Sequence, residues 1–155
     1  MVRSSNIHLT LAFLGDVPVA RIADLVTAAR AIGGSPFELA IDTAGYWRHN
    51  RIVWAGAAHC PAPLRDLVAC LGQALQAMGF QCDAREYAPH ITLLRGARRA
   101  PQPHCAGTIA WRATEFTLTR SARCDGALVY EIVNRCSLVC PPSNPHNADG
   151  IMRDR

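Results

Sequence analysis

The sequence predicts an α+β domain, and three observations lead to this fold class. Two segments carry apolar residues at helical spacing, several shorter segments alternate apolar and polar residues as strands do, and two β-prone segments carry the same His-x-Thr motif. A chain of 155 residues has the length of one domain. We expect a single domain over residues 1–140 and a loose tail over 141–155, where prolines, asparagines and charges replace the apolar pattern.

The His-x-Thr motif occurs at His8 and Thr10 and again at His90 and Thr92. Side chains alternate between the two faces of a strand, so each motif would present one imidazole and one hydroxyl on the face opposite its apolar residues. A single His-x-Thr on a strand is mostly accidental, but two copies beside turn signals favour a functional role. Two such strands brought face to face would form a pocket of two histidines and two threonines.

A pair of imidazoles is suited to in-line phosphoryl transfer without a metal ion. A neutral histidine accepts a proton from water while a protonated histidine gives one to the leaving oxygen. Threonine hydroxyls donate hydrogen bonds to the non-bridging phosphate oxygens, whose charge grows in the transition state. We therefore expect His8 and His90 to be catalytic, with Thr10 and Thr92 on the phosphate.

Two helices are predicted between and around these motifs. Residues 15–18 form a turn into a helix over 22–32, whose aliphatic stripe ends at the glycines 33–34. Pro61 opens a second helix and Gly79 closes it. Both stripes consist of core residues and indicate no chemistry.

The period-two segments predict six further strands, over 37–44, 52–57, 80–85, 108–113, 116–121 and 129–139. Asp125 and Gly126 predict a hairpin turn between the last two. Residues 46–51 form a polar, aromatic loop, which is either a solvated hairpin connection or a lip that stacks a base and holds phosphates. For the basic loop at Arg98 and Arg99, a solvated surface is favoured over RNA contact.

Composition narrows the class of protein. The formal net charge of +4 predicts mild attraction to anions and not the dense basic surface of a tight nucleic-acid binder. No segment resembles a signal peptide or a membrane span, so we expect a cytoplasmic protein without membrane contact. The seven cysteines form no Cys-x-x-Cys pair and are odd in number, which indicates reduced thiols. No ligand spacing supports a zinc site, and we expect no metal and no cofactor.

Residues 6–15 and 89–95 are similar to the motif segments of the two-histidine phosphoesterase superfamily, and in particular of its bacterial RNA 2′,3′-cyclic phosphodiesterase branch, also called 2′–5′ RNA ligases. The resemblance continues through three connecting segments, 37–39, 45–48 and 51–56, and covers most of positions 6–139 in the family's order. It implies two small, mainly antiparallel sheets that face one another across a central cleft. Helices would lie outside, and each lobe would supply one motif strand in a pseudo-two-fold arrangement.

The resemblance also implies the reaction, which is hydrolysis of a 2′,3′-cyclic phosphate at an RNA end to a 2′-phosphate, with reversible 2′–5′ ligation as an accompanying activity. We assign His90 as the base that activates water and His8 as the acid that protonates the departing 3′-oxygen. The pseudo-symmetry leaves these two roles interchangeable. Thr10 and Thr92 would hold the phosphate.

Arg95 matches an arginine that the family places near the phosphate. A regular strand puts its side chain on the face opposite His90, so a strand end, a bulge or the length of the side chain would have to bring it into the cleft. Phe13 has the same parity, and for this residue core packing is favoured over contact with a base.

Two other interpretations stay open. An RNA-end-binding protein without turnover would need only the loop arginines and aromatic residues, although intact His-x-Thr in both copies argues against it. A different two-histidine enzyme would act on a small cyclic nucleotide or on ADP-ribose cyclic phosphate.

Members of the family usually carry a strand and a helix ahead of the first motif, whereas five residues precede Asn6 here. If that element is missing, a sheet edge and apolar surface are exposed. We then expect either a monomer of reduced stability or self-association through the exposed edge.

Overall fold

The structure, a computed structural model, describes residues 1–81, 85–100, 107–124 and 127–139. Within these residues lie two α-helices, two short 3-10 helices and seven strands. In chain order the elements are η1 (Ser4–Asn6), η2 (Val19–Arg21), α1 (Ile22–Ala31), β1 (Phe37–Ile41), β2 (Thr43–Trp47), β3 (Ile52–Gly56), α2 (Ala62–Ala77), β4 (His90–Arg95), β5 (Ile109–Ala113), β6 (Glu115–Cys124) and β7 (Ala127–Ser137). Neither described α-helix is long and apolar enough to cross a membrane.

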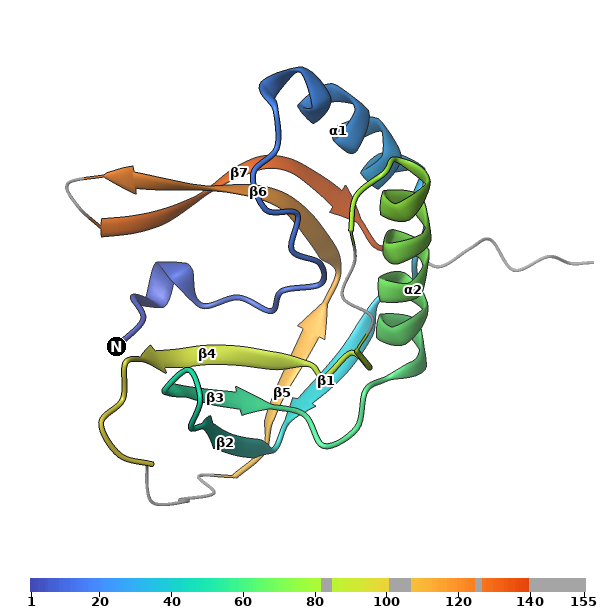
Figure 1. Cartoon of the computed structure of the whole chain (residues 1–155). Coiled ribbons are helices and arrows are strands. Elements are labelled where there is room, and N and C mark those ends of the chain that lie inside the picture. Colours follow the sequence, from blue (N-terminus) through green and yellow to red (C-terminus); the bar gives the residue numbers. More distant parts are fainter. Residues whose placement is uncertain (82–84, 101–106, 125–126, 140–155) are drawn as a thin grey trace, which may run out of the picture.

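The described strands form three antiparallel sheets, with the orders β1-β5, β2-β3-β4 and β6-β7. Figure 1 shows the β2-β3-β4 sheet and the long β6–β7 hairpin on opposite sides of the N-terminal segment, with α1 and α2 outside. Residues 1–13 therefore run between two antiparallel layers. This arrangement confirms the predicted α+β fold class.

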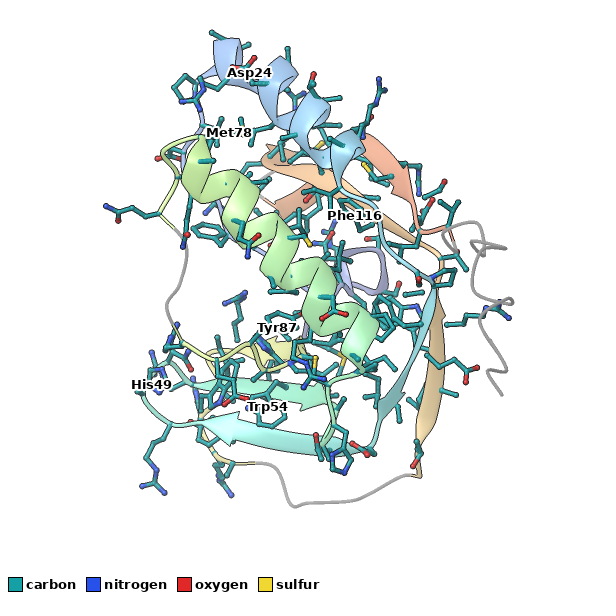
Figure 2. The ribbon with its side chains drawn as sticks, turned by 90° about the vertical axis from the view of Figure 1, so that its right-hand side faces the viewer. Asp24, His49, Trp54, Met78, Tyr87 and Phe116 are labelled. Carbon is teal, nitrogen blue, oxygen red and sulfur yellow. The ribbon has the colours of Figure 1, made fainter. Side chains whose placement is uncertain are left out.

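The core lies between α2 and the strands that it covers. Leu39 of β1 and Leu64 of α2 are fully buried, and Leu67, one turn further along α2, is nearly so. Ile91 of β4 and Phe116 of β6 belong to the same cluster, and Figure 2 shows Phe116 beside α2. Burial of each large aliphatic side chain contributes roughly 1.5–3 kcal/mol. One cluster thus joins a strand of every sheet to α2.

Both predicted helices are confirmed, and the end of α2 shows why it stops there. Gly79 has a φ of 82°, a left-handed conformation that side chains with a Cβ rarely adopt. Its N–H donates to the Gln76 carbonyl (2.9 Å), and the Phe80 N–H donates to the Leu75 carbonyl (2.9 Å). This pair of hydrogen bonds is a Schellman motif, which satisfies the last carbonyls of the helix.

The strand predicted over 80–85 is wrong for its described residues, because Phe80, Gln81 and Arg85 lie outside any strand. The N–H of Phe80 already closes α2, and its ring lies under the guanidinium of Arg21, 5.0 Å from the ring centroid. The backbone N–H of Phe80 is therefore hydrogen-bonded to the end of α2 and is not available to pair with a strand. Residues 82–84 lie outside the described part of the chain.

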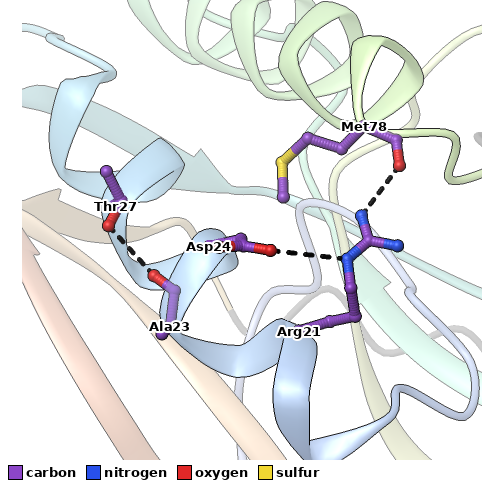
Figure 3. Close-up of polar contacts among 5 residues, drawn as sticks. All are labelled: Arg21, Ala23, Asp24, Thr27 and Met78. Carbon is purple, nitrogen blue, oxygen red and sulfur yellow. Dashed lines mark hydrogen bonds and ion pairs between the residues drawn. The ribbon is translucent and has the colours of Figure 1, made fainter.

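Arg21 joins the start of α1 to the end of α2 (Figure 3). Its Nη2 donates to the Met78 carbonyl at 2.8 Å, and its Nε lies 3.6 Å from Asp24 Oδ2. A cation beside the carbonyls of a helix C-terminus is favourable because the helix dipole is negative there. The two helices are thereby connected at one end by a single side chain.

The strand predicted over 37–44 divides at Asp42. The N–H of Asp42 donates to the Gly56 carbonyl (3.0 Å), and its Oδ1 accepts a hydrogen bond from the N–H of Ala58 (2.8 Å). These contacts turn the chain from the β1-β5 sheet into the β2-β3-β4 sheet. Tyr46 and Trp47, predicted to lie in a loop, end β2 instead.

The remaining predicted strands are confirmed as β3, β5, β6 and β7, with β6 extending three residues further than expected. Cys124 pairs with Ala127, so β6 and β7 are consecutive antiparallel partners. The predicted turn at Asp125 and Gly126 and the predicted tail over 141–155 lie outside the described residues.

Gly45 provides a prediction for stability. A Cβ on Gly45 would lie 2.3 Å from Cζ2 of Trp54, whose ring covers this position. The neighbouring Trp47 ring, whose centroid lies 5.5 Å from that of Trp54, limits the room for the Trp54 ring to move aside. We expect Gly45→Ala to lower the free energy of unfolding by about 1–3 kcal/mol, measured by urea unfolding.

Gly72→Ala is the matched control, because it lies within α2 and a Cβ there meets nothing within 4 Å. Alanine favours the helix over glycine by about 0.8–1.0 kcal/mol, so this variant should be more stable than the wild type. Equal stability of Gly45→Ala and wild type would show that the Trp54 ring is free to yield.

Candidate active site

The two His-x-Thr motifs lie beside one another. The second motif begins β4, as predicted. The first is not a strand: its only ladder contact among the described residues is one antiparallel bridge between Leu9 and Ile91. The prediction of a regular strand at the first motif is therefore wrong, and side-chain hydrogen bonds take the place of a ladder. Asn6 Nδ2 donates to the Leu128 carbonyl (2.7 Å), and Tyr87 Oη donates to the Thr10 carbonyl (3.1 Å).

The Leu9–Ile91 bridge determines which side chains share a face. Directly opposed residues of an antiparallel pair point to the same side. Ile91 is buried and Leu9 packs against the same core cluster, so the neighbouring motif positions point away from the core. A regular continuation of this register would put position 8 opposite 92 and position 10 opposite 90, but among the described residues the first motif forms only this one bridge. Of the four motif side chains, His8 and Thr92 line the same pocket, described below.

Both imidazoles are anchored in the same way. His8 Nδ1 lies 2.7 Å from the Asn6 carbonyl, and His90 Nδ1 lies 2.9 Å from the Ala88 carbonyl. A carbonyl oxygen only accepts hydrogen bonds, so we assign the proton to Nδ1 in both rings. In each neutral ring Nε2 is then the nitrogen that exchanges a proton.

An aromatic ring packs edge-on against each histidine. Tyr130 of β7 lies 4.5 Å from the His8 ring centroid, and Trp47 of β2 lies 4.6 Å from that of His90. The interplanar angles are 61° and 75°, within the edge-to-face geometry that aromatic pairs prefer. Trp47 in turn lies 5.5 Å from Trp54. Each histidine therefore packs against one aromatic ring, and the two aromatic rings come from different antiparallel layers.

A β-bulge determines the direction of Arg95. Val53 pairs with Leu94 and Trp54 pairs with Thr92, which leaves Leu93 as an extra residue in β4. One extra residue reverses the alternation of side chains beyond it. Arg95 therefore comes to the face of Thr92 instead of the opposite face that a regular strand would give.

A pocket of about 280 Å³ opens at the C-terminal end of β4, beside Thr92 and Arg95. Its lining comes from the N-terminal segment, both motifs and the hairpin: Met1, Val2, Arg3, Asn6, His8, Thr92, Arg95, Leu128 and Tyr130. Thr10 and His90 are not part of its lining. Phe13 is 84% exposed, so the interpretation of this residue as core is wrong. Within the described part of the chain, no group of three or more His, Cys, Asp or Glu could hold a metal ion.

Two residues at the site were not found from the sequence, Tyr130 and Tyr87, and Trp47, which belongs to the predicted aromatic lip, was not expected to pack on His90. Tyr130 is brought to His8 by the β6–β7 hairpin from far along the chain. Tyr87 directly precedes the second motif and holds the backbone of the first. Only its position beside the motif could have indicated a role.

Two His-x-Thr segments are joined by a bridge between antiparallel layers, and each carries an imidazole anchored through Nδ1; this arrangement defines a two-histidine phosphoesterase fold. The sequence matches the description "2′-5′ RNA ligase superfamily" over residues 2–125, and the chain belongs to this family.

Relatives of the family have names that describe one activity. The RNA 2′,3′-cyclic phosphodiesterase of Escherichia coli (strain K12) is 38% identical over 139 residues, which are 88% of this chain and 78% of that protein. The protein of the same name from Geobacillus stearothermophilus is 36% identical over 76% of this chain and 39% of its own length. The crystal structure of E. coli LigT complexed with 3′-AMP is similar with a TM-score of 0.82 at 36% identity, over 88% of this chain and 79% of that one.

Tyr87 provides a prediction for the stability of the site. Burial raises the pKa of Tyr87 well above its ordinary value of 10.0, and the nearby Cys60 adds to the rise. As the pH rises above about 10, the unfolded chain loses the phenol proton while the folded chain keeps it, so stability is present below this pH and falls above it. We expect Tyr87→Phe to lose about 0.5–1.5 kcal/mol at neutral pH, through the missing hydrogen bond to Thr10, and to lack this alkaline loss.

Urea unfolding of both proteins from about pH 8 to pH 11 measures both effects. The Tyr46→Phe variant is the control for loss of a tyrosine hydrogen bond elsewhere, because Tyr46 Oη donates to the Ala97 carbonyl (3.2 Å). A Tyr87→Phe protein whose stability falls with alkaline pH as steeply as that of wild type contradicts the assignment.

Proposed function

We propose that this protein hydrolyses the 2′,3′-cyclic phosphate at an RNA end to a 2′-phosphate. The observation that carries the proposal is the pair of imidazoles, each anchored through Nδ1, in two motifs that are joined by the Leu9–Ile91 bridge. The names of the family's relatives support the substrate class. The chemistry needs one group to accept a proton and another to donate one, and this pair supplies both.

In the proposed mechanism His90 Nε2 takes a proton from a water molecule, whose oxygen attacks the phosphorus. The bond between phosphorus and the 3′-oxygen breaks, and protonated His8 gives its Nε2 proton to that oxygen. The phosphate remains on the 2′-oxygen. Proton exchange with solvent then restores both rings. Attack by the 5′-hydroxyl of a second RNA in place of water would join the strands by a 2′–5′ bond through the same proton transfers.

The phosphate would lie between the imidazoles and the two threonines. Thr92 lines the pocket with His8, and in the proposed arrangement Thr10 would take the matching position beside His90. Their hydroxyls would donate to the non-bridging oxygens as charge develops. Arg95, on the same side of β4, adds a guanidinium that suits two phosphate oxygens at once. Phe13 has an exposed ring that could contact only a base lying outside the pocket.

A second candidate is a two-histidine enzyme for small cyclic phosphates. The pocket volume of about 280 Å³ favours it, because this is the size of a site for a small ligand. An RNA-end-binding protein without turnover has no such support, since binding alone needs no second acid–base group. Hydrolysis assays with cyclic-phosphate-ended RNA and with mononucleotides separate these three functions.

Other expectations belong to the same proposal. The free thiols of Cys60, Cys70 and Cys136 suit a reducing cytoplasm. Ile109 and Trp111 of β5 are exposed, at 65% and 37%, and lie opposite buried residues of β1. Self-association would use this apolar edge.

The histidine pair provides the central prediction. Replacing either His8 or His90 by Ala should lower turnover of cyclic-phosphate-ended RNA by about 10²–10⁴, because each removes one proton transfer. His59→Ala is the control, since His59 is exposed in the loop after β3. Urea unfolding verifies that each variant is folded. Full activity in either motif variant would reject the mechanism.

Metal removal provides a second prediction for the reaction. The two imidazoles perform both proton transfers, so turnover should persist after exhaustive treatment with EDTA. The measurement compares rates in the chelated enzyme with rates after adding back Mg²⁺, Mn²⁺ or Zn²⁺. Loss of activity that a single metal restores would show that a metal ion supplies part of the chemistry.

A further inference from the structure

Five arginines gather at the end of the β2-β3-β4 sheet next to the pocket. The segments 43–56 and 87–100 contain these arginines and no aspartate or glutamate. We call them the arginine edge: Arg48, Arg51, Arg95, Arg98 and Arg99. All five side chains are exposed.

Backbone contacts bring the two segments together. The loop after β4 packs against the β2–β3 hairpin, because the Ala97 N–H donates to the Arg51 carbonyl (3.0 Å). Tyr46 Oη donates to the Ala97 carbonyl from the other side (3.2 Å), and Ala97 is buried. Arg95 pairs with Ile52, the first residue of β3. The arginines that follow β4 are therefore next to those of the hairpin tip, and Figure 2 shows labelled His49 at that same tip.

The charges of the arginine edge are not balanced by carboxylates. Elsewhere in the described residues arginines do form ion pairs, as Arg120 does with Glu131 and Arg135 with Glu115. No described carboxylate lies within ion-pair distance of the edge residues. Uncompensated cations that are close together repel one another, and an anion placed among them relieves this repulsion.

The edge is continuous with the pocket, because Arg95 belongs to both. A cyclic phosphate bound beside His8 and Thr92 is the last unit of an RNA chain, so the rest of the chain must leave the pocket past neighbouring surface. RNA carries one phosphate for each nucleotide, and guanidinium groups bind phosphate oxygens in pairs. A row of arginines leading away from the pocket matches this repeating charge.

We propose that the arginine edge binds the phosphates of the RNA strand on the 5′ side of the cyclic phosphate, which makes an RNA oligonucleotide the preferred substrate over a mononucleotide. The inference rests on the proposed hydrolysis and specifies its substrate class. It differs from the expectation from sequence that Arg98 and Arg99 are simply solvated, because that expectation could not include the contact of their loop with the β2–β3 hairpin.

The experiment compares two double variants on two substrates. Arg98→Ala/Arg99→Ala removes two charges of the edge and leaves Arg95 in place. Arg65→Ala/Arg112→Ala removes the same charge from exposed sites on α2 and β5. The substrates are an RNA octamer ending in a 2′,3′-cyclic phosphate and adenosine 2′,3′-cyclic phosphate.

For the edge variant we expect KM for the octamer to rise about tenfold, with kcat unchanged and with less than about a twofold change for the mononucleotide. The dependence of octamer binding on salt should also weaken, since each lost phosphate contact lowers the logarithmic slope by about 0.7. The control variant should behave as wild type on both substrates. An unchanged KM for the octamer, or equal changes on both substrates or in both variants, overturns the proposal.

A binding measurement separates this inference from the proposed reaction. Fluorescence anisotropy with the octamer ending in a 2′-phosphate needs no turnover. If the wild type hydrolyses neither substrate but binds this octamer more tightly than the edge variant does, the reaction is wrong and the edge is supported. If the wild type hydrolyses both substrates and binding is equal in both proteins, the reaction is supported and the edge is wrong.

Discussion

The active-site geometry depends on one backbone contact, the antiparallel bridge between Leu9 and Ile91. It directs Leu9 and Ile91 toward the core cluster and leaves the alternate positions of both motifs on the opposite face. A shift of this register by one residue would turn one histidine and one threonine into the core. Packing against the core thus determines which face of each motif carries the reacting groups.

Two bulges complete the site, one in each antiparallel layer. In β4 the extra residue is Leu93, which brings Arg95 to the pocket. In β7 the shift between Leu118 and Thr119 makes Val133 the extra residue. Before this bulge in the chain, Tyr130 faces His8; after it, Asn134 faces α1 and accepts a hydrogen bond from Arg30 (3.0 Å). In Figure 1, α1 and the first motif lie on opposite sides of the hairpin, as this reversal requires.

These bulges also explain how far the sequence could predict the molecule. Period-two and helical patterns are local, so they identified both helices and most strands. They fail where one residue changes the alternation, as at Arg95, and where a side chain ends an element, as Asp42 does between β1 and β2. The rings on His8 and His90 come from strands distant in sequence, and no local pattern contains that information.

The first motif is held differently from the second, and this difference has a consequence for catalysis. β4 is secured by a full ladder with β3, whereas His8 depends on the bridge and on two side-chain hydrogen bonds, from Asn6 to the hairpin and from Tyr87 to Thr10. Each such bond contributes a net of only about 0.5–1.5 kcal/mol. A small displacement of the hairpin therefore changes the free energy of folding little, although it changes the distance between the two imidazoles. Since proton transfer requires both rings to reach the same phosphate, the rate depends on contacts that contribute little to folding.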